Sequence, residues 1–180
     1  MKAPVAALAL LAGYDKYMDA SQIQEFIAGL VFGLVQKDDL KLIETCLKDG
    51  DTLTKEVTIA LQDFAKKDLQ DILAGVSEIG VVLQQLPQDL GDCTGMQPDI
   101  QRIENWAQIF KDPKLLIQTV TSNIIKNYKE ITTDIASTYS DIQAQNFYNA
   151  GVDIADLMIA NLGPVPKADE QPEYLQQTQW

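Results

Sequence analysis

The sequence predicts an all-α fold, an irregular bundle of six to eight helices held together by one disulfide and followed by a flexible C-terminal tail. Apolar residues recur three and four positions apart through most of the chain, which is the period of an amphipathic helix. Proline, glycine and short polar residues divide this pattern into segments of helical length, and no segment alternates as a strand does. With 180 residues, of which 46% are hydrophobic, the chain is long enough to bury a sizeable core.

Four helices are expected in the first half of the chain. Ser21 can cap the first and Asp68 the fourth, because short polar side chains accept hydrogen bonds from the first turn of a helix. Asp51 or Thr52 suits the start of the third, and Pro87 stops or kinks the fourth. The expected helices cover residues 21–36, 40–47, 53–64 and 69–86.

The second half begins with a loop, residues 91–98, followed by a helix over 99–110. Asp112 and Pro113 mark a strong boundary, since Asp caps a helix and Pro suits its first position. Residues 115–145 are expected to form one long helix or a kinked pair, and 147–162 form the last helix, which Gly163 ends. The chain therefore divides into an N-terminal apolar segment (1–19), a helical bundle (20–163) and a polar tail (164–180).

The N-terminal segment has two interpretations. One positive charge at Lys2 precedes a run of small and apolar residues, as in a secretory signal, so residues 1–13 are either a signal remnant or the first helix of the mature protein. No apolar run approaches the roughly 20 residues that a transmembrane helix needs.

The chain is strongly acidic, with a net charge of −12 at pH 7. Such a surface repels phosphate backbones and anionic membranes, which argues against nucleic-acid binding and membrane adsorption. Basic partners, divalent cations and neutral apolar ligands remain open.

The two cysteines, Cys46 and Cys93, are predicted to form one disulfide, which places the chain in an oxidising compartment. The chain has no His, so two thiols cannot complete an ordinary zinc site, and neither Cys has a His partner for nucleophilic catalysis. A phosphate-binding loop and a Gly-x-Ser-x-Gly elbow are also absent. We therefore expect no metal, no cofactor and no catalytic residue.

Carboxylates are the remaining candidates for chemistry. Asp153 and Asp156 share one helix face, and Asp134 and Asp141 share another two turns apart. Such pairs act in acid–base catalysis or cation binding, but a solvated acidic face is the favoured interpretation. The Asp49-Gly50-Asp51 stretch resembles part of a calcium loop, yet Leu53 replaces the third ligand, which favours a capped turn.

Two other features bear on packing and assembly. Gly29 and Gly33 lie four residues apart on an almost wholly apolar helix, which predicts close approach of another helix. Tyr174, Leu175 and Trp180 lie in the acidic tail, where they could dock into a groove of a neighbouring copy. An inert tail is the alternative.

Several segments in order resemble a large group of small, usually secreted, two-cysteine helical proteins of ciliates and other protists. The resemblance covers about residues 20–165 and rests on Phe26–Leu34, Cys46, Gly75–Gly80, Leu86–Leu90 with Cys93, Asn105–Phe110, Ala150–Asp156 and Leu162–Val165. The group has no established activity, so the resemblance implies export and a shared fold and transfers no catalytic residue. The tail after Val165 lies outside the pattern.

These observations predict a non-enzymatic structural or protein-interaction protein that is secreted or lumenal and associates with itself or with a protein partner. An intracellular location is the alternative. The alternative function is a carrier that holds an apolar ligand or lipid in a cavity of the bundle. A hydrolase that uses carboxylates alone is disfavoured, because it needs a preorganised pair in a cleft.

Overall fold

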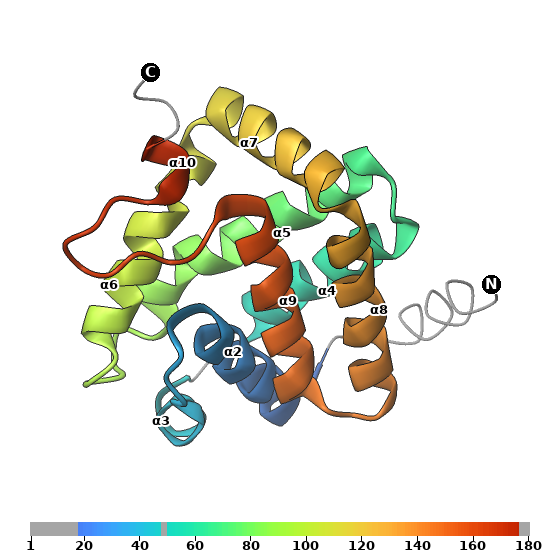
Figure 1. Cartoon of the computed structure of the whole chain (residues 1–180). Helices are drawn as coiled ribbons and strands as arrows, with labels where there is room; N and C mark the ends of the chain where they lie inside the picture. Colours follow the sequence, from blue (N-terminus) through green and yellow to red (C-terminus); the bar gives the residue numbers. More distant parts are fainter. Residues whose placement is uncertain (1–17, 48–49, 177–180) are drawn as a thin grey trace.

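The computed structural model describes residues 18–47 and 50–176, and within these ranges the chain is helical and contains no strand. Most of the N-terminal apolar segment, together with Asp49 and Trp180, lies outside the described residues. The helices are α2 (Ala20–Val35), α3 (Leu40–Cys46), α4 (Asp51–Lys66), α5 (Leu69–Asp89), α6 (Gln97–Trp106), the 3₁₀ helix η1 (Ala107–Lys111), α7 (Pro113–Lys126), α8 (Tyr128–Gln143), α9 (Phe147–Leu162) and α10 (Glu173–Gln176). They form the irregular bundle of Figure 1, and α2 to α9 confirm the predicted six to eight helices.

Side-chain caps set several helix starts. Asp19 begins α2 with a capping box, in which its side chain accepts a hydrogen bond from the Gln22 backbone and the Gln22 side chain returns one. This start lies two residues before the predicted cap, Ser21. Asp68 caps α5 and Asp112 caps α7, with Pro113 as the first residue of α7, as predicted.

The predicted region 115–145 forms two helices, α7 and α8, which meet at Asn127. The Asn127 side chain donates a hydrogen bond to the carbonyl oxygen of Ala160 at 3.1 Å, which ties this junction to the end of α9. Pro87 does not end α5, which continues to Asp89 before a turn leads to Cys93.

The closest packing in the bundle lies between α2 and α9, which run side by side (Figure 1). Gly29 and Gly33 on α2 and Gly151 on α9 leave room for this approach. A Cβ atom on Gly29 would overlap the carbonyl oxygen of Tyr148, and one on Gly151 would overlap that of Phe26. The two backbones are therefore in direct contact, which only glycine permits at these positions.

The other half of the bundle is organised by α5, which packs against α4, α6, η1 and α7. The α4–α5 hairpin turns at Lys67, which has a left-handed backbone conformation. Phe64 of α4 packs against Gly75 of α5, and the Tyr139 hydroxyl of α8 donates a hydrogen bond to the Leu61 carbonyl oxygen. These contacts join α4, α5 and α8 around one apolar core.

Alanine at Gly33 tests the α2–α9 contact because the obstacle there is a side chain, the Cβ of Ala155. We expect Gly33→Ala to lower the free energy of unfolding by about 1–3 kcal/mol through overpacking. Adding Ala155→Gly should recover part of this loss, less the roughly 1 kcal/mol that glycine costs within a helix. Chemical denaturation of the three proteins measures both effects.

Gly29→Ala is the matched contrast, since its obstacle is the backbone of Tyr148 and no side-chain change can remove it. We expect a larger loss of stability than for Gly33→Ala. Equal stability of Gly29→Ala and the unmodified protein would show that the two helices do not pack this closely.

Candidate functional site

The predicted disulfide is present and joins Cys46 to Cys93, with a Cα–Cα distance of 5.4 Å. It links the end of α3 to the turn between α5 and α6. Cys93 is buried, with 1% of its surface exposed, whereas Cys46 is partly buried, so the bridge lies at the edge of the core.

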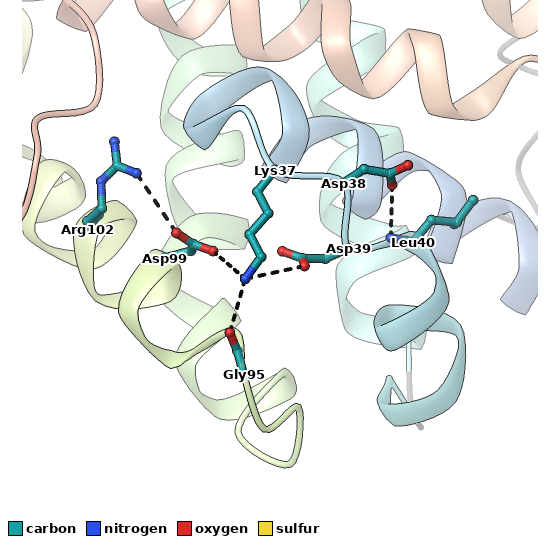
Figure 2. A network of polar contacts seen from close by, with 7 residues as sticks. All are labelled: Lys37, Asp38, Asp39, Leu40, Gly95, Asp99 and Arg102. Carbon is teal, nitrogen blue, oxygen red and sulfur yellow. Dashed lines mark hydrogen bonds and ion pairs between the residues drawn. The ribbon is translucent and has the colours of Figure 1, made fainter.

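A second link joins the same two regions and is ionic (Figure 2). The Lys37 ammonium, in the loop after α2, lies 3.2 Å from the carbonyl oxygen of Gly95 and 3.3 Å from a carboxylate oxygen of Asp99. It also lies 3.9 Å from Asp39 Oδ1, and Arg102 lies 3.9 Å from the other oxygen of Asp99. We call Lys37, Asp39, Gly95, Asp99 and Arg102 the lysine clamp.

Asp39 is the most buried charged group of the lysine clamp, since only 3% of its surface is exposed. Its Oδ2 atom is buried and has no hydrogen-bond partner. Burial raises the pKa of Asp39, and the nearby Lys37 ammonium opposes this shift. The Lys37 ammonium thus neutralises two carboxylates at the point where the α2–α3 loop meets α6, which indicates a structural role.

The Lys37-Asp38-Asp39 stretch lies between two helices that the sequence predicts, 21–36 and 40–47. The charged triplet was visible, but its partners Asp99 and Arg102 are more than 50 residues away in the chain. Among the described residues, no group of three or more Cys, Asp or Glu side chains is arranged to hold a metal ion.

The two predicted carboxylate pairs are brought together by the packing of α8 against α9. Asp153 of α9 faces Asp141 and Ser137 of α8, and Asp134 of α8 lies near Asp156 of α9. We call Asp134, Asp141, Asp153 and Asp156 the acidic seam. One carboxylate oxygen of Asp134 and one of Asp153 are buried without a hydrogen-bond partner.

Like charges and burial raise the pKa values along these helix contacts. Burial, with a hydrogen bond to Asp141, raises the pKa of Asp153 to about 7. Burial, with the charges of Asp156 and Glu130, raises the pKa of Asp134 to about 6. Between α4 and α5, a hydrogen bond with Glu56 and burial raise the pKa of Glu78 to about 7. The sequence favoured a solvated acidic face, whereas Asp134 and Asp153 are partly buried.

The described part of the tail, residues 164–176, packs against α6 and η1. The buried Tyr174 donates its hydroxyl hydrogen to the carbonyl oxygen of Trp106 at 2.7 Å. The Trp106 indole N–H donates to the carbonyl oxygen of Gly163 at 3.1 Å, and Arg102 donates to that of Pro166 at 3.0 Å. Leu175 stays 36% exposed. In this conformation, Tyr174 is held within its own chain.

Two hollows in the described surface are small and polar in part. One, of about 230 Å³, lies between α7, the end of α9 and α10, and includes Asn123, Lys126 and Glu173 in its lining. Another, of about 240 Å³, lies between α5 and α6–η1 and is lined in part by Gln84 and Glu104. A third hollow, of about 420 Å³, lies where α7 meets α8 and includes Lys129, Glu130 and Asp134 in its lining. Charged and polar side chains contribute to the lining of all three hollows, unlike the apolar cavity that a lipid carrier requires.

Removing the disulfide should lower stability substantially. The bridge closes a loop across a sequence separation of 47 residues, for which the chain-entropy model gives about 4 kcal/mol. We expect Cys46→Ser/Cys93→Ser, or reductant, to lower Tm by roughly 10 °C. Calorimetry with and without reductant measures this, and the double Ser variant is the control that reductant must leave unchanged. Equal Tm values for the oxidised and reduced protein would contradict the expected contribution.

Stability should fall as the pH rises from about 5.5 to about 8. In the unfolded chain Asp and Glu titrate near pH 4, so the raised pKa values of Asp153 and Glu78 mean that the folded state binds protons more tightly. This contribution to stability is fully present below about pH 4 and is lost as the pH rises through about 7. We expect a higher Tm at pH 5.5 than at pH 8.

Asp153→Asn isolates the contribution of the acidic seam because it removes a charge with little change in shape. We expect this variant to have a higher Tm than the unmodified protein at about pH 8 and a weaker dependence of Tm on pH. Glu104→Gln, at an exposed position of α6, is the control and should leave the pH dependence unchanged. A Tm that rises between pH 5.5 and pH 8 would contradict the effect.

Within the described ranges, no helix is both long and apolar enough to cross a membrane. No curated protein and no solved structure matches the chain. One family model, SctB-like, described as secreted protein B-like, matches residues 10–160. The description indicates a secreted protein and names no enzymatic activity, in line with the expected export; the link to ciliates and to a two-cysteine pattern stays a prediction. Because the match spans most of its length, the chain belongs to the SctB-like family.

Proposed function

We propose that this protein acts outside the cell as a non-enzymatic structural or interaction protein that assembles with copies of itself by exchanging its tail. The observation that carries the proposal is the contact of Tyr174 with Trp106, at the end of a connection that leaves α9 at Gly163. A segment held by a few contacts in its own chain can make the same contacts in a second copy.

The connection has the features of an exchange hinge. Ten residues, 163–172, join α9 to α10, and three of them are prolines, which stiffen an extended chain. The polar contacts of the tail with the bundle include those of Arg102, Trp106 and Tyr174, and a second copy of the chain offers the same groups. The tail also follows the last residue of the family match, residue 160, so it is outside the part that defines the family.

The carrier alternative has less support, because charged and polar side chains contribute to the lining of all three hollows described above. The acidic seam gives little support to an enzymatic role. Asp134 and Asp153 are partly buried between two helices, and the hollow that Asp134 borders includes neither Asp141 nor Asp153, so no carboxylate pair of the seam faces it.

Shortening the hinge tests tail exchange, because a hinge too short to fold back on its own chain should make the protein dimerise. Deletion of residues 167–170 removes about 13 Å of reach, so Tyr174 can no longer meet Trp106 of its own chain without strain. We expect the shortened protein to form a dimer in which each tail occupies the other copy. Sedimentation velocity over a range of concentrations measures the change.

Two controls make the experiment specific. Replacing residues 167–170 by Gly and Ser at unchanged length should leave the oligomeric state of the full chain unchanged. Tyr174→Ala in the shortened chain should abolish its dimer. A shortened chain that remains monomeric, with its tail open to proteolysis, would overturn the proposal of tail exchange.

A further inference from the structure

One helix of this acidic chain carries the opposite charge. The segment from Lys111 to Lys129, which contains α7, has four lysines and a single carboxylate, Asp112. Its net charge is therefore +3, which leaves −15 for the rest of a chain whose total is −12. Asp112 is engaged as the N-cap of α7, where its side chain accepts a hydrogen bond from the Leu115 backbone.

The same helix exposes large apolar side chains. Ile117 is 52% exposed and Ile125 is 69% exposed, and Tyr128, directly after α7, is 46% exposed. Lys114, Ile117, Thr121 and Ile125 are spaced three, four and four residues apart, so they share one side of the helix. We call this side, with Tyr128, the basic apolar stripe.

The residues of the stripe are exposed because α7 uses its opposite side to pack against the bundle. Leu116, Val120 and Ile124 are buried against the bundle, which gives the helix its core contacts. The four lysines of the segment are exposed, and none of them forms an ion pair within the described part of the chain. A helix with a second apolar stripe and unpaired lysines fits a partner that is both acidic and partly apolar.

The acidic seam of a second copy has the complementary charge. Asp156 is exposed on α9 and Glu130 is exposed on α8, and buried oxygens of Asp134 and Asp153 lie beneath them without hydrogen-bond partners. The carboxylates of the seam destabilise one another, so a lysine brought close to them lowers the repulsion. In Figure 1, α7 lies along one edge of the bundle, whereas α8 and α9 run away from that edge.

We propose that the basic apolar stripe of one copy binds the acidic seam of a second copy, in a head-to-tail contact. The two surfaces differ, so a pair of copies still has one free stripe and one free seam, and the contact can repeat along an open chain of molecules. This contact is separate from tail exchange, because it involves neither Tyr174 nor Trp106.

A charge exchange tests the contact in the full chain with its disulfide intact. Lys114→Glu places a carboxylate opposite the seam, and Asp156→Lys places an ammonium opposite the stripe, so each variant alone should self-associate at least about tenfold more weakly than the unmodified protein. An equimolar mixture of the two variants should recover association, since both contacts then pair opposite charges. Sedimentation equilibrium at low salt measures the dissociation constants, and added salt should weaken binding.

Lys55→Glu is the matched control, because it makes the same charge change at an exposed position of α4 and should leave association unchanged. Ile125→Asp should weaken association as Lys114→Glu does. Tyr174→Ala removes tail exchange, so adding it to both charge variants should leave the recovery of association in their mixture unchanged, which separates this contact from tail exchange. The proposal is overturned if the mixture associates no better than either variant alone, or if the unmodified protein stays monomeric. It is also overturned if the stripe variants change only binding to phosphatidylserine vesicles.

Discussion

The arrangement of this bundle depends on the direct backbone contact between α2 and α9. Three glycines permit it, and Gly29 and Gly151 each lie against a backbone atom of the other helix. Helices normally pack with axes 8–10 Å apart because side chains separate them. Removing those side chains makes the two helices a single rigid unit, whose outer sides meet α3, α7 and α8. The lysine clamp begins directly after α2, and the acidic seam lies between α8 and α9. The contact between α2 and α9 therefore determines where both lie.

The disulfide and the lysine clamp act on the same pair of segments by different physics. The covalent bond restricts the unfolded chain, whereas the clamp places one ammonium between two carboxylates in the folded chain. The clamp holds the loop before α3 and the disulfide holds the end of α3, so together they attach both ends of α3 to the turn before α6 and to the first turn of α6. Arg102 of the clamp also donates a hydrogen bond to the carbonyl oxygen of Pro166, which links the tail to the clamp.

Much of the fold could be predicted from local signals in the sequence, since apolar spacing and caps act within a few residues. Asp68, Asp112 and Pro113 begin helices as their chemistry demands, and the two cysteines pair. Pro87 was expected to stop or kink its helix, but it lies only two residues before the end of α5. The tail was expected to be flexible because it is polar, and a contact that the sequence did not indicate is the one between Tyr174 and Trp106 in its described part. One aromatic residue in a polar segment carries little signal until its distant partner is known.

The candidate sites were less predictable, because each one combines residues from separate helices. Spacing placed Asp153 and Asp156 on one helix face and Asp134 and Asp141 on another, but it could not show that the two faces meet. Likewise, nothing in the sequence indicates that Lys37 and Asp99 form an ion pair. The four lysines around α7 can be read in the sequence, yet a helical pattern alone does not reveal which apolar residues of this helix remain exposed.

The position of the disulfide has a consequence for survival among extracellular proteases. All of α4 and α5 lies between Cys46 and Cys93, including the exposed-side turn at Lys67 where the hairpin reverses. A single cleavage between the two cysteines would leave two fragments that remain covalently joined by the disulfide. The cut chain therefore loses no fragment, and α7, α8 and α9 remain together on one of the two pieces.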